Sequence, residues 1–346
     1  MKHVYTSFLT FTLLIFTATG VYAQGPNDSG TYYAAADGKK GYELKTALCG
    51  IIRAGLEDNV VSYTPGLWNA YPKTDAKPDD NTKVWDMYSN TTNFTFGDDQ
   101  DKGSGGTSEG QFYNREHSFP REWFGGAKAP MNTDLFHVYP TDKLVNNKRS
   151  SFPYGETTGE DYTLNGKNLK GYKSNNDFSK LGLNTYSDYE GTVFEPNDIY
   201  KGDFARSYFY MVTCYESELP TWTSAQEHTL DGTTGHAFKD WQLNMLMKWA
   251  KNDEVSEKET NRNKEVYKIQ SNRNPFIDYP GLEEYIWGDL VNVAFSYDDY
   301  KTPTAIMTIK AEPANKEGVM YNLAGQVVDK SYKGIVIMNG KKFFNK

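Results

Sequence analysis

Apolar residues recur along much of the chain at the three- and four-residue spacing of buried helix faces. This spacing appears between Gly41 and Leu56, again after Asp203, and around residues 241–250, and it predicts a helix in each segment. A fourth segment, 256–270, carries charges on most sides, so we expect a helix that exposes one face. The apolar positions of the three faces are Leu44, Ala47, Leu48, Ile51 and Ile52; Phe204, Tyr208, Met211, Val212 and Tyr215; and Trp241, Leu243, Leu246, Met247 and Ala250.

Turn-forming residues dominate two other stretches. Residues 64–110 are rich in Asp, Asn, Gly, Thr and Pro, with Val84–Tyr88 as the one short strand candidate. A similar composition runs from about residue 156 to 184. We therefore expect long loops in both stretches, on either side of a more compact unit at 112–156.

Beyond Trp287 the pattern changes to short alternating runs, at 306–309, 319–321 and 335–338. The last run ends in Asn339-Gly340, which is a hairpin signal. These runs predict a small β-rich appendage. The absence of any sequence period of about 20 to 50 residues argues against solenoids and propellers.

The N-terminus has the pattern of a secretory signal. Lys2 precedes an apolar run from Phe8 to Phe16, and small residues lead to Ala23. No cysteine follows at a lipoprotein position, and no later stretch approaches the about 20 apolar residues of a membrane span. We predict a secreted, extracytoplasmic protein, in the periplasm, at the cell surface or in the medium.

Cysteine content and charge narrow the function classes. The two cysteines, Cys49 and Cys214, allow at most one disulfide and exclude a zinc site built on cysteines. Both lie in helical patterns, so we expect buried thiols, with a disulfide as the alternative. The net charge of −8 argues against a histone- or repressor-like binder. A local basic groove is still expected from Lys248, Lys251, Lys258, Arg262, Lys264, Lys268 and Arg273.

The segment from Asn114 to Ser151 contains the residues best suited to chemistry. It contains Asn-Arg-Glu-His-Ser-Phe-Pro, Asp-Leu-Phe-His-Val-Tyr-Pro and Val-Asn-Asn-Lys-Arg-Ser-Ser, separated by two strand-like runs and one helix-like run. Together they supply imidazole, oxygen ligands for a hard cation, and guanidinium groups. Hydrolysis of a phosphodiester needs such a set: a base for water, and positive charge near the phosphate oxygens.

Glu116 and His117 pose a geometric problem, because adjacent side chains in a regular strand face opposite ways. They can serve one site only if the backbone bends there. Pro120 indicates an early end to the strand. A lone histidine is otherwise more often a structural hydrogen-bond donor than a base.

The three motifs resemble the core of the endonuclease I family, which are secreted or periplasmic His-Me finger nucleases with a ββα-metal fold. Two later pieces are also similar to this family: Lys-Gly-Asp-Phe-Ala-Arg at 201–206 with Phe-Tyr-Met at 209–211, and Asn-Arg-Asn-Pro-Phe-Ile-Asp-Tyr-Pro at 272–280. The resemblance runs in order from about Tyr42 to Trp287.

The resemblance implies an α+β fold, a mainly helical scaffold with long loops around a ββα-metal core, with the β-rich appendage added. It implies that His117 is the general base and that Glu116 and Asn146 hold one Mg²⁺, with Ca²⁺ or Mn²⁺ as substitutes. The expected reaction is non-specific, single-metal cleavage of DNA, and of RNA, leaving 5′-phosphate and 3′-hydroxyl ends. The implied organisation is a signal peptide at 1–23, a nuclease domain at 24–290, a linker at 291–304 and a tail at 305–346.

The chain departs from the family pattern in two places. Phe136 stands where many relatives have His, and Ser150-Ser151 stands where Gly-Asn is common. For the arginine that stabilises the transition state we take Arg149, with Arg121 and Lys128 as alternatives. Four more residues are candidate substrate or phosphate contacts: Arg115, His137, Arg206 and Arg273. For the last three a structural role is the alternative.

Two other functions stay open. An exported ligand- or glycan-binding protein could use the many aromatic residues without catalysis, but it would not need Glu116, His117 and Asn146 together. A metallohydrolase acting on phosphomonoesters or peptides is less well supported, because no His-Glu-x-x-His pattern is present. No obligate protein partner is indicated. The last 40 or so residues resemble, through weak motifs, the sorting or anchoring tails of exported Bacteroidetes proteins; a packing module is the alternative.

Overall fold

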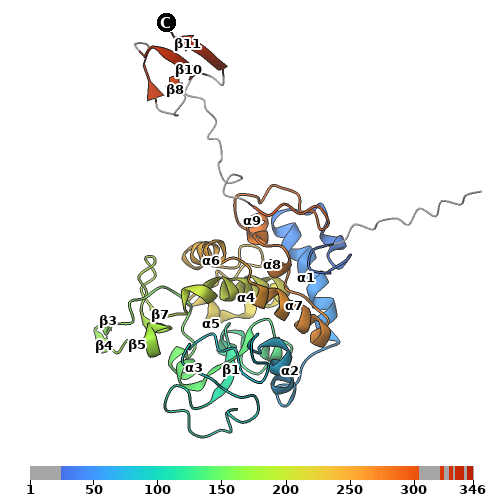
Figure 1. Ribbon diagram of the computed structural model, residues 1–346, viewed down its shortest axis with the longest axis vertical. Coiled ribbons are helices and arrows are strands. Elements are labelled where there is room, and N and C mark those ends of the chain that lie inside the picture. Colours follow the sequence, from blue (N-terminus) through green and yellow to red (C-terminus); the bar gives the residue numbers. More distant parts are fainter. Residues whose placement is uncertain (1–24, 304–319, 323–326, 330–331, 339–340, 346) are drawn as a thin grey trace, which may run out of the picture. The chain divides into compact units, whose positions relative to one another are not determined.

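The computed structural model describes residues 25–303, 320–322, 327–329, 332–338 and 341–345 (Figure 1). The chain divides into two compact units, residues 1–301 and 302–346. The predicted signal peptide and the apolar run at 306–309 lie outside the described residues. Helices and small antiparallel sheets make up the rest, so the fold is of the mixed α+β class.

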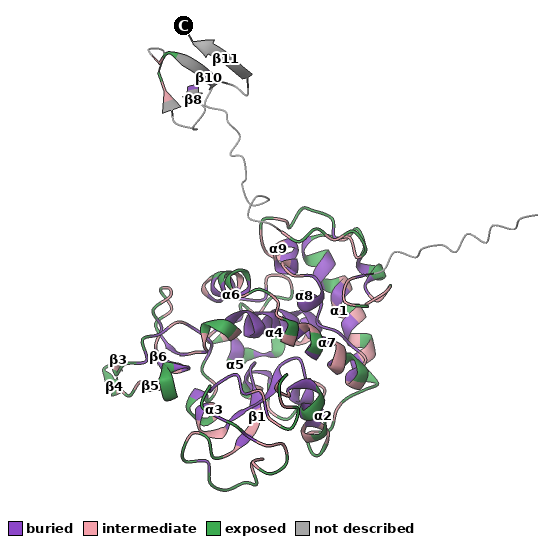
Figure 2. Cartoon of the chain, in the orientation of Figure 1, coloured by how far each residue is buried: buried purple, intermediate pink, exposed green. Residues whose placement is uncertain are grey.

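Helix α4 (Lys201–Cys214) forms the centre of the larger unit, and all of its residues are buried (Figure 2). Helices α1 (Gly41–Glu57), α6 (Asp240–Asn252) and α8 (Pro275–Asp278) pack against it. The predicted apolar faces of α1, α4 and α6 make these contacts. Burial of each large apolar side chain stabilises the fold by roughly 1.5–3 kcal/mol. The helices predicted at Gly41–Leu56, after Asp203 and at 241–250 are confirmed.

The two cysteines lie where α1 and α4 meet. The Cys49 thiol donates to the Cys214 carbonyl oxygen at 3.5 Å, and both thiols are free. The structure thus has two separate thiols at this contact between the helices.

Helix α7 (Glu257–Gln270) begins with a capping box. Ser256 Oγ accepts a hydrogen bond from the Glu259 amide at 3.2 Å, and the Glu259 carboxylate accepts one from the Ser256 amide at 2.9 Å. These two bonds satisfy amide groups that a helix start leaves unpaired. The helix was expected to expose one face, and Tyr267 and Lys268 are exposed there.

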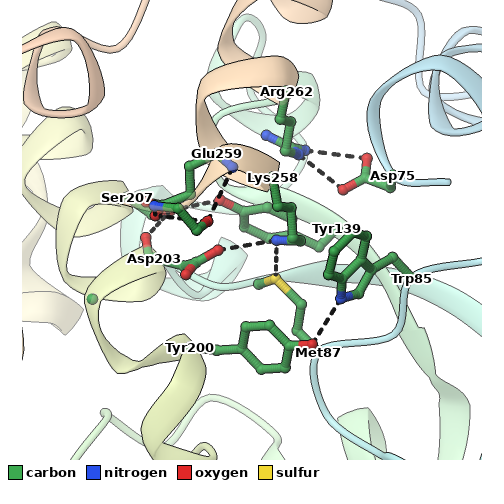
Figure 3. A network of polar contacts seen from close by, with 12 residues as sticks. Asp75, Trp85, Met87, Tyr139, Tyr200, Asp203, Ser207, Lys258, Glu259 and Arg262 are labelled. Carbon is green, nitrogen blue, oxygen red and sulfur yellow. Dashed lines mark hydrogen bonds and ion pairs between the residues drawn. The ribbon is translucent and has the colours of Figure 1, made fainter. Parts of the chain in front are cut away.

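The opposite face of α7 carries buried ion pairs (Figure 3). Lys258 pairs with Asp203 at 3.0 Å, and Arg262 pairs with Asp75 at 2.8 Å. Glu259 accepts two hydrogen bonds from Arg206, at 2.5 and 2.9 Å. These pairs join α7 to α4 and to the C-terminal end of α2 (Gly66–Thr74).

The stretch from 64 to 110 differs from its prediction in two respects. Helix α2 lies in it although no helix was expected there. Its apolar residues pack on α7 despite Pro72 within the helix. The predicted strand at Val84–Tyr88 is wrong, because the segment makes a single isolated bridge, from Val84 to Ala76. Tyr88 is instead fully buried against Phe194 and Phe204.

The remaining elements of the larger unit are short. Strands β3 and β4 form a hairpin, and β5, β6 and β7 form an antiparallel sheet in that order. Strands β3 to β6 lie in the second stretch that was expected to be loop, and β7 follows it. Their bounds, with those of two small helices, are β3 Tyr162–Leu164, β4 Lys167–Leu169, β5 Tyr172–Lys173, β6 Lys180–Leu183, β7 Thr192–Glu195, α5 Thr223–Gln226 and α9 Leu282–Ile286.

Much of the segment expected to be a linker, 291–304, packs on the larger unit. The Phe295 ring is buried against Tyr279, and the Phe295 backbone exchanges hydrogen bonds with Gly38 and Lys39. Tyr300 also packs against Tyr279. The larger unit therefore extends to about residue 301, because the Phe295 ring is buried in it and the half-buried Tyr300 ring packs against it.

The smaller unit is an antiparallel sheet with the strand order β11-β10-β8-β9. Met338 pairs with Lys341 across the predicted hairpin turn, whose residues 339–340 lie outside the described part. The bounds are β8 Met320–Asn322, β9 Val327–Val328, β10 Gly334–Met338 and β11 Lys341–Asn345.

Candidate functional site

Two antiparallel strands and a following helix carry the motif residues. Strand β1 (Tyr113–His117) pairs with β2 (Val138–Asp142), with Glu116 opposite Tyr139 and His117 opposite Val138. Helix α3 (Lys143–Arg149) follows directly, and the Asp142 side chain caps it by accepting from the Val145 amide at 2.9 Å. This compact arrangement brings residues from all three motifs together.

A cleft of 480 Å³ opens beside β1 and α3. Glu116, His117 and Asn146 line it together, as the sequence analysis expected. Its other lining residues are Tyr63, Asn114, Arg115, Pro120, Arg121, Glu122, Asn147, Arg149, Ser150 and Ser151. Most of these side chains are polar or charged, which suits a charged ligand better than an apolar one.

His117 is the last residue of β1, and this position resolves the problem of adjacent side chains. The strand alternation ends there, so Glu116 and His117 can line the same cleft. Arg149 closes the turn that follows: its guanidinium donates to the His117 carbonyl oxygen at 2.7 Å and to the Ser118 carbonyl oxygen at 2.6 Å. The early end of the strand that Pro120 indicated is observed, and an arginine from α3 holds the residues that follow it.

The Glu116 carboxylate is buried, with 1% of the residue exposed. Its Oε1 accepts hydrogen bonds from the Tyr88 hydroxyl at 2.8 Å and from Arg149 Nη1 at 2.9 Å. Burial raises the pKa of Glu116, while the Arg149 charge and the Tyr88 hydroxyl oppose the rise. Because both bonds engage Oε1, Oε2 is the oxygen left to accept a ligand from the cleft.

The His117 imidazole is 8% exposed and its Nε2 lies 3.0 Å from the Asn132 carbonyl oxygen. A carbonyl only accepts, so Nε2 carries the hydrogen in this bond. Burial lowers the pKa of His117 to about 3, and the neighbouring His137 adds to this effect. The ring is therefore neutral, with its lone pair on Nδ1.

The Asn146 side chain extends from α3 toward the end of β1. Its Nδ2 donates to Asn114 Oδ1 at 2.8 Å, and more weakly to the Arg115 carbonyl oxygen at 3.5 Å. These bonds fix the orientation of the amide, and they leave its oxygen, Oδ1, as the atom that can bind a cation.

Arginines and an aromatic ring form another part of the cleft lining. Arg115 stacks on Tyr63 with its guanidinium carbon 3.7 Å from the ring centroid, and it donates to the Tyr63 carbonyl oxygen at 2.9 Å. The Tyr63 ring is also stacked near His117, with centroids 6.3 Å apart. Arg121 and Glu122, which begin a short 3-10 turn, bring one charge of each sign.

Three of the four candidate phosphate contacts lie outside the cleft lining. Arg206 and Arg273 are 2% and 3% exposed and are engaged by two-point ion pairs, with Glu259 and with Asp278. His137 is fully buried and its Nε2 donates to the Met131 carbonyl oxygen at 2.6 Å. Burial and these partners favour the structural alternative for all three, and Arg115 is the candidate that lines the cleft.

The basic groove expected from the lysines and arginines at 248–273 is not formed as such. Lys258, Arg262 and Arg273 have their side chains directed inward to Asp203, Asp75 and Asp278. Lys248, Lys264 and Lys268 pair with acidic side chains at the surface. These lysines and arginines lie close together in the sequence, but most of them form ion pairs within the protein and do not share one binding surface.

Sequence reasoning missed several residues that hold the site together. Tyr88 and Asn114 orient Glu116 and Asn146, and Asn132 orients His117. Asn114 is within the first motif, so its position gave a usable signal. Tyr88 and Asn132 gave none, because one contacts the site from a distant loop and the other acts through its backbone.

The donor atoms of the cleft fit a hard cation. Glu116 Oε2 and Asn146 Oδ1 are oxygen ligands, and Mg²⁺ often takes only one or two protein ligands and keeps several waters. Among the residues that the structure describes, no group of three or more acidic, His or Cys side chains is arranged to hold a metal.

In the same part of the chain, no helix has the length and apolar character of a membrane span.

Comparison with known proteins places this chain in a family. Residues 40–281 match the sequence profile of Endonuclease I. The chain is 32% identical over 265 residues to an extracellular ribonuclease of Bacillus subtilis (strain 168), covering 75% of this chain and 79% of that protein. An extracellular ribonuclease of Bacillus amyloliquefaciens is 33% identical with the same coverage.

A third relative is more distant. Endonuclease-1 of Buchnera aphidicola subsp. Baizongia pistaciae is 26% identical over 179 residues, which is 47% of this chain and 60% of that protein. The family match covers both strands and the helix of the cleft as well as α4 and α7. The chain therefore belongs to the endonuclease I family.

Proposed function

We propose that this protein is a secreted endonuclease that hydrolyses phosphodiester bonds in DNA and RNA and leaves 5′-phosphate and 3′-hydroxyl ends. The observation that carries the proposal is the cleft in which His117, Glu116 and Asn146 meet. Family membership and relatives named as extracellular ribonucleases and as an endonuclease support it. We further propose that β1, β2 and α3 act as a ββα-metal, or His-Me, finger.

His117 is the general base in this proposal. Its Nε2 hydrogen is held by Asn132, so Nδ1 is free to accept a proton from a water molecule in the cleft. A neutral ring is required for this step, and burial keeps the ring neutral. A nucleic acid backbone bound in the cleft brings negative charge, which raises the pKa of the imidazole toward the working pH.

Glu116 and Asn146 would hold one Mg²⁺, for which Ca²⁺ or Mn²⁺ can substitute, through Oε2 and Oδ1. When bound there, the cation supplies positive charge for the phosphate and for the leaving oxygen. Tyr88 and Arg149 hold the carboxylate, and Asn114 holds the amide, so both oxygens are oriented before a ligand arrives.

The arginines divide between two roles. Arg149 is 1% exposed and its guanidinium is engaged by Glu116 and two carbonyl oxygens, so it positions the site. Arg121 lines the cleft, so we assign it the contact with the phosphate oxygens in the transition state. Arg115, held against Tyr63, is proposed to contact the backbone of the substrate.

The test is cleavage of supercoiled plasmid by the purified mature protein with Mg²⁺, repeated with a chelator and with a single-stranded RNA. We expect cleavage with Mg²⁺ and none with the chelator. His117→Ala should lower the rate by about three orders of magnitude or more without loss of fold. His236→Ala is the matched control, because this half-buried histidine contacts Asp231 and does not line the cleft.

The outcomes separate the alternatives. Intact plasmid and RNA under all conditions would favour the exported binding protein over a nuclease. Full activity in His117→Ala would remove His117 from the mechanism.

We also propose that residues 1–23 direct export, that residues 24–290 carry the nuclease domain, and that 305–346 act in sorting. Removal of 305–346 is then expected to leave the specific activity unchanged but to alter where the protein accumulates. Fractionation of cells and medium measures this. An unchanged distribution would support the packing alternative for the tail.

A further inference from the structure

Two histidines donate hydrogen bonds to consecutive carbonyl groups of a single turn. His117 Nε2 donates to the Asn132 carbonyl oxygen at 3.0 Å, and His137 Nε2 donates to the Met131 carbonyl oxygen at 2.6 Å. Their rings are 5.6 Å apart, and the His137 carbonyl oxygen accepts from the Ser118 amide at 2.9 Å. The 3-10 turn at Met131–Thr133 is thus attached to the ends of both strands.

The carbonyls of Met131 and Asn132 belong to adjacent peptide units, so displacement of one changes the direction of the other. The turn is buried, with Met131 6% and Asn132 7% exposed, and His137 is fully buried. The Asn132 amide also donates to the Lys128 carbonyl oxygen at 2.8 Å. His137 is the side chain that donates to the Met131 carbonyl oxygen, and the Asp134 amide donates to the same oxygen over a longer distance, 3.4 Å.

The consequence concerns the tautomer of His117. A neutral imidazole carries its hydrogen on either nitrogen, and the acceptor that faces the ring selects which one. With the Asn132 carbonyl in place, the hydrogen is on Nε2 and the lone pair is on Nδ1. If that carbonyl turns away, the Nδ1–H form gains population, and this form cannot accept a proton from the cleft.

We propose that His137 is a positioning residue, which holds the Met131–Asn132 turn so that the Asn132 carbonyl keeps His117 in its base-competent tautomer. The proposal rests on the role of His117 as base in the proposed function. It assigns His137 no contact with substrate, in agreement with its burial. The alternative is that His137 only fills space beside Phe124, whose ring meets it edge-on at 5.8 Å.

Two substitutions separate these readings. His137→Phe keeps an aromatic ring but removes the donor, and His137→Gln keeps an N–H donor on a chain of similar reach. We expect His137→Phe to lower kcat about tenfold with KM changed less than about twofold, and His137→Gln to recover most of that loss. A space-filling role predicts the opposite order, with Phe better tolerated than Gln.

A matched control removes general destabilisation from the comparison. Phe136→Leu changes a buried neighbour of His137 in the chain, whose ring packs on Tyr210 of α4. It should lower the unfolding midpoint while kcat stays within about twofold of wild type. If Phe136→Leu lowers kcat as much as His137→Phe does, the positioning role is overturned.

A measurement without activity completes the test. Nitrogen-15 chemical shifts of the imidazoles in the metal-free protein report which nitrogen of His117 carries hydrogen. We expect the Nε2–H form in wild type and in His137→Gln, and more Nδ1–H in His137→Phe. An Nδ1–H form in wild type overturns the proposal whether or not the variants fold, and an unchanged tautomer in a folded His137→Phe variant overturns it as well.

Failure of this inference is distinguishable from failure of the proposed function. If His117→Ala is inactive while His137→Phe keeps its kcat, only the positioning role is lost. If His117→Ala keeps full activity, the general-base assignment is lost as well.

Discussion

Arg149 makes several of the contacts that hold the residues of the cleft in place. Its guanidinium neutralises Glu116 and bonds two carbonyl oxygens at the end of β1, and its guanidinium carbon lies 4.9 Å from the Tyr154 ring centroid. Because the pair is fully buried, loss of the cation leaves an uncompensated carboxylate in a medium that solvates it poorly.

Arg149→Met is therefore expected to lower the free energy of unfolding by about 3–5 kcal/mol. Arg149→Lys keeps the charge but loses the fork that bonds several oxygens, so roughly 1–3 kcal/mol is expected. Urea unfolding followed by circular dichroism measures both. Wild-type stability in Arg149→Met would show that Glu116 is not ionised against this arginine.

Some features of these residues could be predicted from the sequence and others could not. Glu116, His117 and Asn146 were expected to meet because their motifs resemble those of the endonuclease I family, and the three residues line one cleft. The inward role of Arg149 and the tautomer-setting carbonyl of Asn132 were not predictable. Residue type encodes neither the direction of a long side chain nor the orientation of a peptide group.

Among the elements, helix α7 buries charged side chains by pairing them with acidic residues of neighbouring elements. Its side chains at Lys258 and Arg262 are 7% and 4% exposed, and they pair with Asp203 and Asp75 from α4 and from the end of α2 (Figure 3). Lys258 also lies over the rings of Trp85 and Tyr200, at 5.6 and 5.4 Å.

Lys258→Met should destabilise the protein by about 3–5 kcal/mol, because Asp203 stays buried without its partner. In the double variant Lys258→Met/Asp203→Asn the buried charge is gone, so we expect at least half of the lost stability to return. Unfolding midpoints of the two single variants and the double variant form the cycle. A double variant less stable than Lys258→Met would contradict this account.

Helices were predicted correctly where the apolar spacing within the segment indicated them. They were missed or misinterpreted where burial or charge pairing depended on another part of the chain. The faces of α1, α4 and α6 follow from their own periodicity. Helix α2 was missed because its nine residues include Pro72 and its burial comes from α7. The lysines and arginines of α7 were read as a binding surface because their acidic partners lie far away in sequence.

At the scale of the whole molecule, the fold buries two carboxyl groups, Glu283 and Asp86, whose pKa burial raises more than neighbouring groups lower it, and these groups contribute to how stability depends on pH. Burial raises the pKa of Glu283 to about 7 and that of Asp86 to about 7. Glu283 is 5% exposed, and its Oε2 has no hydrogen-bond partner among the described residues. Their ordinary pKa values, near 4, apply in the unfolded chain.

The raised pKa values fix the direction in which stability changes with pH. Between about pH 4 and pH 7 these two carboxyl groups keep protons in the folded protein that they have released in the unfolded chain, so their contribution to stability falls as the pH rises. For Glu283 the contribution is fully present below its unfolded pKa and is lost as the pH passes about 7, amounting to as much as roughly 3 kcal/mol. Glu283→Gln stays neutral throughout, so its stability should fall less between pH 5 and pH 8 than that of wild type. Thermal unfolding of both proteins across this range measures the difference, and parallel curves would mean that Glu283 has the same pKa in the folded and unfolded states.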